Sequence, residues 1–124
     1  MKTSTDSLAE RLSRDSEITL TITGRKSGRA ISTPVWFVWE NGTVYLLPVR
    51  GSTTQWYQNL LNNPSLRIDA GGVGASFQAV PVTDPAQVSA VVEKFRKKYG
   101  AGDVKKYYAT FDAAVVVNAG GKAK

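Results

Sequence analysis

The sequence contains no cysteine and no histidine among its 124 residues. The lack of cysteine excludes disulfides, thiolate catalysis and cysteine metal sites. The lack of histidine excludes an imidazole as a partner for serine, as a zinc ligand or as a general base near neutral pH. The carboxylates are scattered and form no acid–base pair or metal-ligand cluster in the sequence. If the chain is an enzyme, we therefore expect a bound cofactor to carry its chemistry.

Long hydrophobic runs are missing as well. No apolar segment approaches the roughly 18–20 residues that a membrane-spanning helix needs. Residues 1–14 are polar and of mixed charge, unlike a secretory signal. These patterns predict a cytoplasmic protein without a membrane span. The length predicts one domain with its own core.

The net charge of +6 indicates an anionic partner. Lys122 and Lys124 contribute to it from a Gly-rich tail that we expect to be disordered. The other cations concentrate near residues 25–29, at Arg50 and in a helix-like segment at residues 93–106. No recognition-helix or RNA-binding signature accompanies them, so a small molecule is favoured over nucleic acid, which stays the alternative.

The most informative stretch is a basic turn (residues 24–29), with the sequence Gly24-Arg25-Lys26-Ser27-Gly28-Arg29. Before it, apolar residues alternate with threonine from residue 18 to residue 23, the period of a half-buried strand. After it, residues 30–39 are again strand-like and end at Asn41-Gly42, a strong hairpin signal. Cations, a hydroxyl and free amides in one turn suit a phosphate or carboxylate. A solvated hairpin tip is the alternative.

The rest of the chain predicts an antiparallel barrel of about six strands with few helices. Further strands are expected at residues 43–49, 65–69, 74–82 and 113–117. Helices are expected near the N-terminus from Ser7, at residues 54–61, and from the N-cap Asp84 to about Gly100. Residues 104–111 are expected to be helical or irregular, and Pro34 indicates an edge strand or a bulge.

The order of these motifs resembles the deazaflavin-dependent nitroreductase family. The resembling segments are residues 23–28, Pro34-Val35, residues 49–51 and residues 56–64, and the likeness extends over residues 18–118. The resemblance implies a mainly β fold, a six-stranded antiparallel split β-barrel of the FMN-binding type. It also implies a bound coenzyme F(420), with FMN as the second choice, and an oxidoreductase that transfers hydride between the cofactor and a small organic substrate.

By resemblance, the cofactor-binding residues are Arg25, Lys26, Ser27, Pro34, Val35, Val49, Arg50, Gly51, Trp56 and Asn59. The basic turn would bind the phosphate and the acidic tail. Pro34 and Val35 would line the ring, and residues 49–51 would bring backbone amides and one cation to it. The helical Trp56 and Asn59 would support the pocket. No catalytic acid or base and no metal is expected.

Three departures from the family pattern stand in this sequence. Ile31 replaces a second arginine after the basic turn, and Arg29 is a possible substitute. In the family, the third strand ends in small residues followed by Ser-Lys or Ser-Arg and a longer Gly-rich loop. This chain has Leu47-Pro48-Val49-Arg50 instead, and its loop before Trp56 is short. Adjacent Tyr107 and Tyr108 stand where the nitroreductases carry spaced tyrosines, and either a lid or plain packing fits them.

Several assignments keep an alternative. Trp56 is as typical of a core as of a pocket wall, and Asn59 is typical of local hydrogen bonding. The aromatic surface of Trp36, Trp39 and Tyr45 favours a homodimer seam or core over cofactor stacking. A non-catalytic carrier on the same barrel is the alternative function. The predicted division is a helical segment at residues 1–16, a barrel at residues 17–118 and a disordered tail at residues 119–124.

Overall fold

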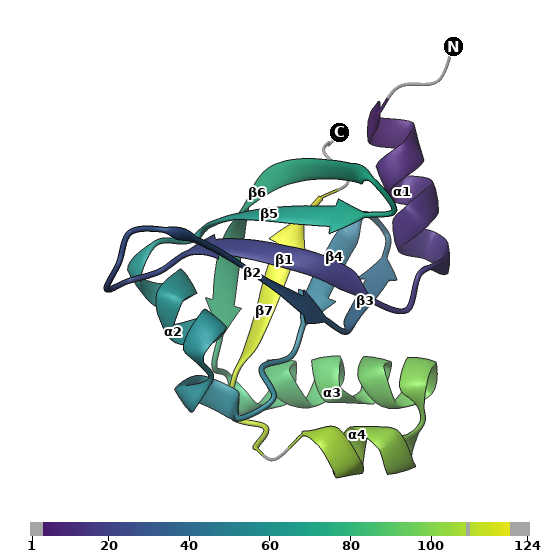
Figure 1. The fold of residues 1–124 in the computed structure, drawn as a ribbon. Coiled ribbons are helices and arrows are strands. Elements are labelled where there is room, and N and C mark those ends of the chain that lie inside the picture. Colours follow the sequence, from purple (N-terminus) through teal and green to yellow (C-terminus); the bar gives the residue numbers. More distant parts are fainter. Residues whose placement is uncertain (1–3, 109, 120–124) are drawn as a thin grey trace.

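The computed structural model describes residues 4–108 and 110–119, and its fold is drawn in Figure 1. The strands are β1 (Ile18–Thr23), β2 (Ala30–Val35), β3 (Phe37–Glu40), β4 (Thr43–Leu46), β5 (Ser65–Ala70), β6 (Val73–Val82) and β7 (Ala114–Asn118). The helices are α1 (Ser4–Arg14), the 3-10 helix η1 (Gly51–Thr53), α2 (Gln55–Asn62), α3 (Pro85–Tyr99) and α4 (Ala101–Tyr107). Of the predicted tail, residues 120–124 lie outside the described residues.

The strands form one antiparallel sheet in the order β2-β1-β5-β6-β7-β4-β3. The sheet curls into a half-barrel, with α1 and α2 on opposite sides of it (Figure 1). The mainly β split-barrel fold is thus confirmed, and β7 is a central strand as expected. The predicted strand count is wrong by one, because the described residues form seven strands instead of six.

The additional strand arises because the run predicted as one strand, residues 30–39, is divided at Trp36. Its first half pairs with β1 and its second half with β4, so the chain crosses from one half of the sheet to the other. At the crossing, the Phe37 N–H donates to the Tyr99 hydroxyl at 3.0 Å, and the Lys98 ammonium donates to the Phe37 carbonyl at 2.8 Å. The end of α3 thereby satisfies backbone groups that the sheet leaves unpaired.

Local sequence signals are correct for β1, for the hairpin between β3 and β4 and for the edge position of β2, whereas β4 ends at Leu46 and is shorter than the strand predicted at residues 43–49. Ile18, Leu20 and Ile22 are buried, in line with the alternation along β1. Asn41 and Gly42 have φ values of 51° and 78° at the hairpin between β3 and β4. Pro34 lies in β2, which is an edge strand of the sheet. Its missing N–H therefore removes no hydrogen bond from an inner strand.

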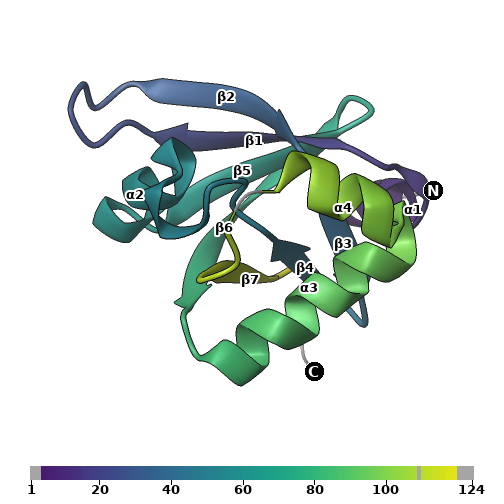
Figure 2. The same cartoon turned by 90° about the horizontal axis from the view of Figure 1, so that it is seen from below.

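Two hydrophobic clusters hold the fold together. The larger cluster joins side chains from most of the strands to Leu12 of α1 and Leu60 of α2. The second cluster lies between the sheet and the α3–α4 pair, and it includes Val38, Phe95 and Val104. The two helices lie side by side across one end of the half-barrel (Figure 2). Each of these α-helices therefore contributes to the core, α1 and α2 to the larger cluster and α3 and α4 to the second.

Capping residues predict both ends of α3 correctly, but they do not predict the start of α1. The Asp84 carboxylate accepts the Gln87 N–H at 3.1 Å and caps α3, which ends before Gly100 as predicted. The predicted start of the first helix at Ser7 is wrong, because α1 already contains Ser4. Within residues 4–108 and 110–119, no helix has the length and apolarity that a bilayer crossing requires.

Candidate functional site

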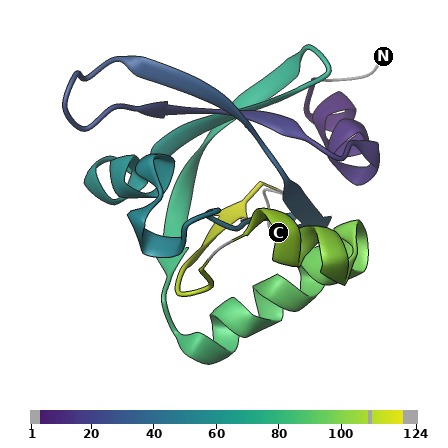
Figure 3. The same ribbon diagram turned by 60° about the horizontal axis from the view of Figure 1, so that its bottom comes forward.

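The basic turn links β1 to β2 and projects past α2 at the edge of the molecule (Figure 3). It is closed by two backbone bonds, from the Gly28 N–H to the Gly24 carbonyl at 2.9 Å and from the Gly24 N–H to the Arg29 carbonyl at 2.8 Å. Gly28 has a φ of +71°, a conformation that favours glycine. Its Lys26 and Ser27 are exposed. The predicted tight turn is therefore confirmed.

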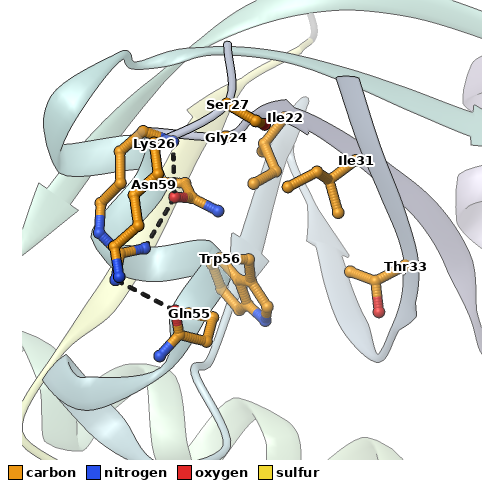
Figure 4. A pocket seen from close by; sticks show the side chains of 10 residues that line it. Ile22, Gly24, Lys26, Ser27, Ile31, Thr33, Gln55, Trp56 and Asn59 are labelled. Carbon is orange, nitrogen blue, oxygen red and sulfur yellow. Dashed lines mark hydrogen bonds between the residues drawn. The ribbon is translucent and has the colours of Figure 1, made fainter. Parts of the chain in front are cut away.

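Arg25 points back to α2 and is bound there by side-chain amides. Its N–H and Nη1 both donate to the Asn59 Oδ1, at 3.0 and 2.8 Å, and its Nη2 donates to the Gln55 Oε1 at 3.1 Å (Figure 4). Asn59 is buried, and only 5% of its surface is exposed. The side-chain oxygen of Asn59 therefore bonds to the basic turn, 34 residues away in the chain, and not locally as its sequence context suggested. Arg25 is consequently held in one orientation before any ligand arrives.

A first cavity of about 430 Å³ lies between the basic turn, β2 and α2. Its lining residues are Ile22, Gly24, Arg25, Lys26, Ser27, Ile31, Thr33, Gln55, Trp56 and Asn59. Ile31 and Thr33 face Trp56 across it (Figure 4). The cavity therefore has an apolar floor and a cationic end.

A second cavity of about 450 Å³ adjoins the first, since Thr33 and Trp56 line both. Its lining residues are Glu17, Thr33, Pro34, Val35, Trp36, Leu47, Val49, Thr54, Trp56, Tyr107 and Tyr108. A smaller third cavity of about 240 Å³ brings Arg50 next to Val49 and Trp56. The three cavities share Trp56, so they meet at the N-terminal turn of α2.

Aromatic rings form one wall of the second cavity. Trp36 stacks on Tyr99 with ring centroids 4.2 Å apart and an interplanar angle of 7°. It also meets Tyr107 edge-on at 5.6 Å and Tyr108 at 6.0 Å. Burial raises the pKa of Tyr108 above its usual range, so its hydroxyl stays protonated at neutral pH. Trp36 therefore forms part of the cavity wall and also packs against the second hydrophobic cluster, which agrees with the core position that the sequence allowed for it.

The Arg50 loop (residues 49–53) lies at the junction of the second and third cavities. The Arg50 N–H donates to the Thr54 Oγ1 at 2.8 Å, and the Gly51 N–H donates to the Pro48 carbonyl at 3.1 Å. Val49 is 41% exposed and reaches the second cavity. Gly51 is buried and lines none of these three cavities, so it shapes the loop and does not face the space.

The residues proposed from the sequence therefore divide between adjoining spaces. Arg25, Lys26, Ser27, Trp56 and Asn59 line the first cavity. The second cavity is lined by Pro34, Val35, Val49 and Trp56, and the third cavity is lined by Arg50 together with Val49 and Trp56. No structural finding assigns these residues to a cofactor, so their roles stay predictions.

Sequence reasoning missed several lining residues. Ile31 and Thr33 alternate with Pro34 along β2, so strand periodicity contains the signal for them. Gln55 precedes Asn59 by four residues and shares its helix face, which is also visible in the sequence. Glu17 gives no comparable signal, because it reaches the second cavity from outside the resembling motifs.

Comparisons with known proteins agree with this arrangement. The family model described as F420H(2)-dependent quinone reductase matches residues 1–119. A solved F(420)H(2)-dependent reductase is 20% identical with a TM-score of 0.64, and the match covers 82% of this chain and 93% of that one. A structure described as a domain-swapped dimer is 19% identical with a TM-score of 0.66, covering 93% and 99%.

The haem storage protein of Vibrio cholerae is 14% identical with a TM-score of 0.67, covering 95% of this chain and 90% of that one. At such identities the solved structures establish a shared fold, and the family match carries the function. No curated protein matches the chain significantly. On the family model, the chain belongs to the F420H(2)-dependent quinone reductases and is an oxidoreductase whose cofactor is the deazaflavin F(420).

Proposed function

We propose that the first and second cavities form one groove that holds F(420), with its anionic end at the basic turn and its ring in the second cavity. The observation that carries this proposal is that Thr33 and Trp56 line both cavities. A cationic end and an apolar end are therefore contiguous. Each cavity falls within the range of about 300–1,000 Å³ that is typical of ligand pockets.

The residues present fit such a cofactor at its charged end. Among the described residues the ion pairs are Arg67–Asp69, Lys94–Glu40 and Arg96–Glu93, and none belongs to the basic turn. Lys26 and Arg29 are exposed at the turn, while Arg25 is anchored to α2. Two exposed cations beside one anchored guanidinium suit a phosphate followed by a flexible acidic tail.

The other end fits a flat ring. Pro34, Val35 and Val49 offer apolar surface, and Trp36 adds an aromatic face that its stacking on Tyr99 holds in place. Polar groups on this wall are few. Reduced F(420), when bound, supplies a hydride, so the chain has to orient the ring, exclude water and leave one face open.

We propose a quinone as the substrate class, in accordance with the family description. Tyr107 is 51% exposed at the edge of the second cavity and can cover a flat substrate stacked on the cofactor. Tyr108 is buried, and its neutral hydroxyl can donate a hydrogen bond to a carbonyl oxygen that gains negative charge. Neither residue has to act as a base.

The proposal is tested by titrating the purified protein with F(420) and, separately, with FMN, using fluorescence quenching. Preferential binding of F(420) and anaerobic oxidation of reduced F(420) by a short-chain quinone are expected. Binding of FMN without binding of F(420) would contradict the cofactor assignment. Binding of F(420) without any turnover of quinones would contradict the substrate class while leaving the groove in place.

We also propose a homodimer, supported by the similar fold that forms a domain-swapped dimer. The aromatic surface used as the sequence argument gives it less support, because Trp36, Trp39 and Tyr45 each pack partly on the chain's own core. The outer edge of β2 pairs with no other strand of the described sheet and is a free edge for a second copy. Sedimentation as a 13.4 kDa monomer at high concentration would refute the dimer.

A further inference from the structure

Asp112, near the C-terminal end of the chain, is hydrogen-bonded to Ser52 of the Arg50 loop. Its Oδ1 accepts the Ser52 N–H at 2.7 Å, and its Oδ2 accepts the Ser52 hydroxyl at 2.7 Å. Asp112 follows α4 and precedes β7, sixty residues from its partner. The two bonds hold the pKa of Asp112 below its usual range, so the carboxylate is ionised at neutral pH.

The contact between the two segments is close as well as polar. Gly51 has a φ of +60°, and a Cβ added to it would overlap the Asp112 Oδ1. The Thr110 Cγ2 would lie 2.9 Å from the same Cβ. Arg50 and Thr110 also form a parallel backbone bridge. Glycine at residue 51 thus leaves the room that the carboxylate occupies.

A second set of contacts holds the Arg50 loop from the opposite side. The Thr54 Oγ1 accepts the Arg50 N–H, and the Gln58 side-chain amide donates to the Ser52 carbonyl. These partners lie at the start of α2 and are only four to six residues away. Ser52 therefore has a local anchor on α2 and a long-range anchor on Asp112.

The segment that contains Asp112 follows Tyr107 and Tyr108 in the chain. Both tyrosines line the second cavity together with Val49, and Tyr108 stacks on Phe111 at 6.4 Å. The bond between Asp112 and Ser52 therefore links the segment that follows the two tyrosines to the Arg50 loop. If this bond is lost, the Arg50 loop keeps its contacts with Thr54 and Gln58 and the backbone bridge to Thr110, but its side-chain anchor on the segment after α4 is gone.

We propose that Asp112 is a positioning residue, which fixes the Arg50 loop so that Val49 and Arg50 meet the cofactor in one geometry. This inference rests on the proposed function, because it assigns the cofactor to the cavities at the loop. Asp112 lines none of the three cavities and acts through Ser52. It is expected to affect cofactor binding more than turnover.

The test compares Asp112→Ala with Asp112→Asn and with Asp84→Ala. Asp84 is the matched control, because it is also an exposed carboxylate that caps a helix through a backbone N–H, at the start of α3. Asp112→Ala should raise the Kd for F(420) about tenfold while kcat at saturating F(420) stays within about twofold. Asp112→Asn keeps an acceptor for the Ser52 N–H and should recover most of the affinity. Asp84→Ala should lower the Tm and leave the Kd unchanged.

A measurement on the cofactor-free protein tests the positioning role of Asp112 separately from the proposed binding of F(420). Amide hydrogen exchange at Ser52 should accelerate at least tenfold in Asp112→Ala and stay unchanged in Asp84→Ala. Unchanged exchange at Ser52, or faster exchange without a change in Kd, would overturn the positioning role. Failure of the parent protein to bind F(420) would instead refute the proposed function, whatever the exchange rates show.

Discussion

The two ends of the proposed groove are built differently. The cationic end is one short turn whose Arg25 is bound by two amides of α2, with Lys26 and Arg29 exposed. The aromatic end brings together the β2–β3 crossing, the Arg50 loop and α4, which are far apart in the chain. Binding at the cationic end therefore depends on exposed charge, and binding at the aromatic end depends on packing. Added salt screens the attraction of exposed charges, whereas it leaves packing contacts unchanged.

Gly51→Ala should have the largest effect, at the aromatic end. The variant places a Cβ where the Asp112 carboxylate lies and forces an unfavourable φ of +60° on alanine. We expect a loss of about 2–4 kcal/mol in the free energy of unfolding, measured by urea denaturation. Gly72→Ala is the control, because Gly72 has a φ of +87° with open space around it. Equal losses in both variants would show that packing at Gly51 adds nothing to backbone strain.

Lys26→Ala should weaken the cationic end without affecting the other. If the exposed ammonium contacts phosphate, we expect the Kd for F(420) to rise about 10- to 150-fold, with the larger effect at low salt. The free energy of unfolding should change by no more than about 0.5 kcal/mol, as is usual for an exposed turn. Arg50→Ala should act in the same direction if the Arg50 loop, at the adjoining third cavity, reaches the same ligand. A Kd equal to that of the parent, as expected for the control Lys97→Ala, would mean that the turn is a solvated tip.

Asn59→Ala tests whether the anchor on α2 matters to the turn. Its Oδ1 accepts two bonds from Arg25, so truncation leaves both donors without that partner. We expect about 1–2 kcal/mol less stability and a weaker affinity for F(420), read by denaturation and by fluorescence titration. Asn63→Ala is the matched control, since Asn63 caps the following strand through the Ser65 N–H and faces neither cavity. Loss of stability with an unchanged Kd would limit Asn59 to a structural role.

The smallest expected effect is a dependence of stability on pH that belongs to the aromatic end. Loss of water around Lys98 lowers its pKa to about 8, below its ordinary value of 10.5. Between these values the unfolded chain binds more protons than the folded one, so the free energy of unfolding should rise with pH. Burial raises the pKa of Tyr99 from 10.0 to about 12, so above pH 10 this hydroxyl should make stability fall.

Urea denaturation at pH 8, 9 and 10 measures this dependence. Lys98→Met keeps an unbranched apolar side chain, removes the ammonium that lies 3.7 Å from the centre of the Phe37 ring, and should remove the rise in stability. Lys97→Met controls for the removal of one positive charge from the same turn of α3. A rise that persists in Lys98→Met would assign the pH dependence to other groups.

Sequence reasoning was most successful where the information is contiguous. The basic turn, the Asn41-Gly42 hairpin and the Asp84 cap each lie within a few residues, and each could be predicted from local chemistry. The division of the predicted strand at residues 30–39 could not, because the side chains that bond to the backbone beside it, Tyr99 and Lys98, come from more than sixty residues away. The bond from Asp112 to Ser52 was invisible for the same reason.

The position of Lys26 and Arg29 on a projecting hairpin has a kinetic consequence. The turn extends past α2 at the edge of the molecule (Figure 3), and Lys26 and Arg29 are exposed there, so their field reaches into the solvent. An anionic cofactor approaching by diffusion meets these cations first, and electrostatic steering of this kind raises association rates. In the proposed groove, residence time would then depend on packing at the aromatic end. Capture and retention of the cofactor would thus fall to different parts of one small chain, and added salt should slow its arrival far more than it speeds its departure.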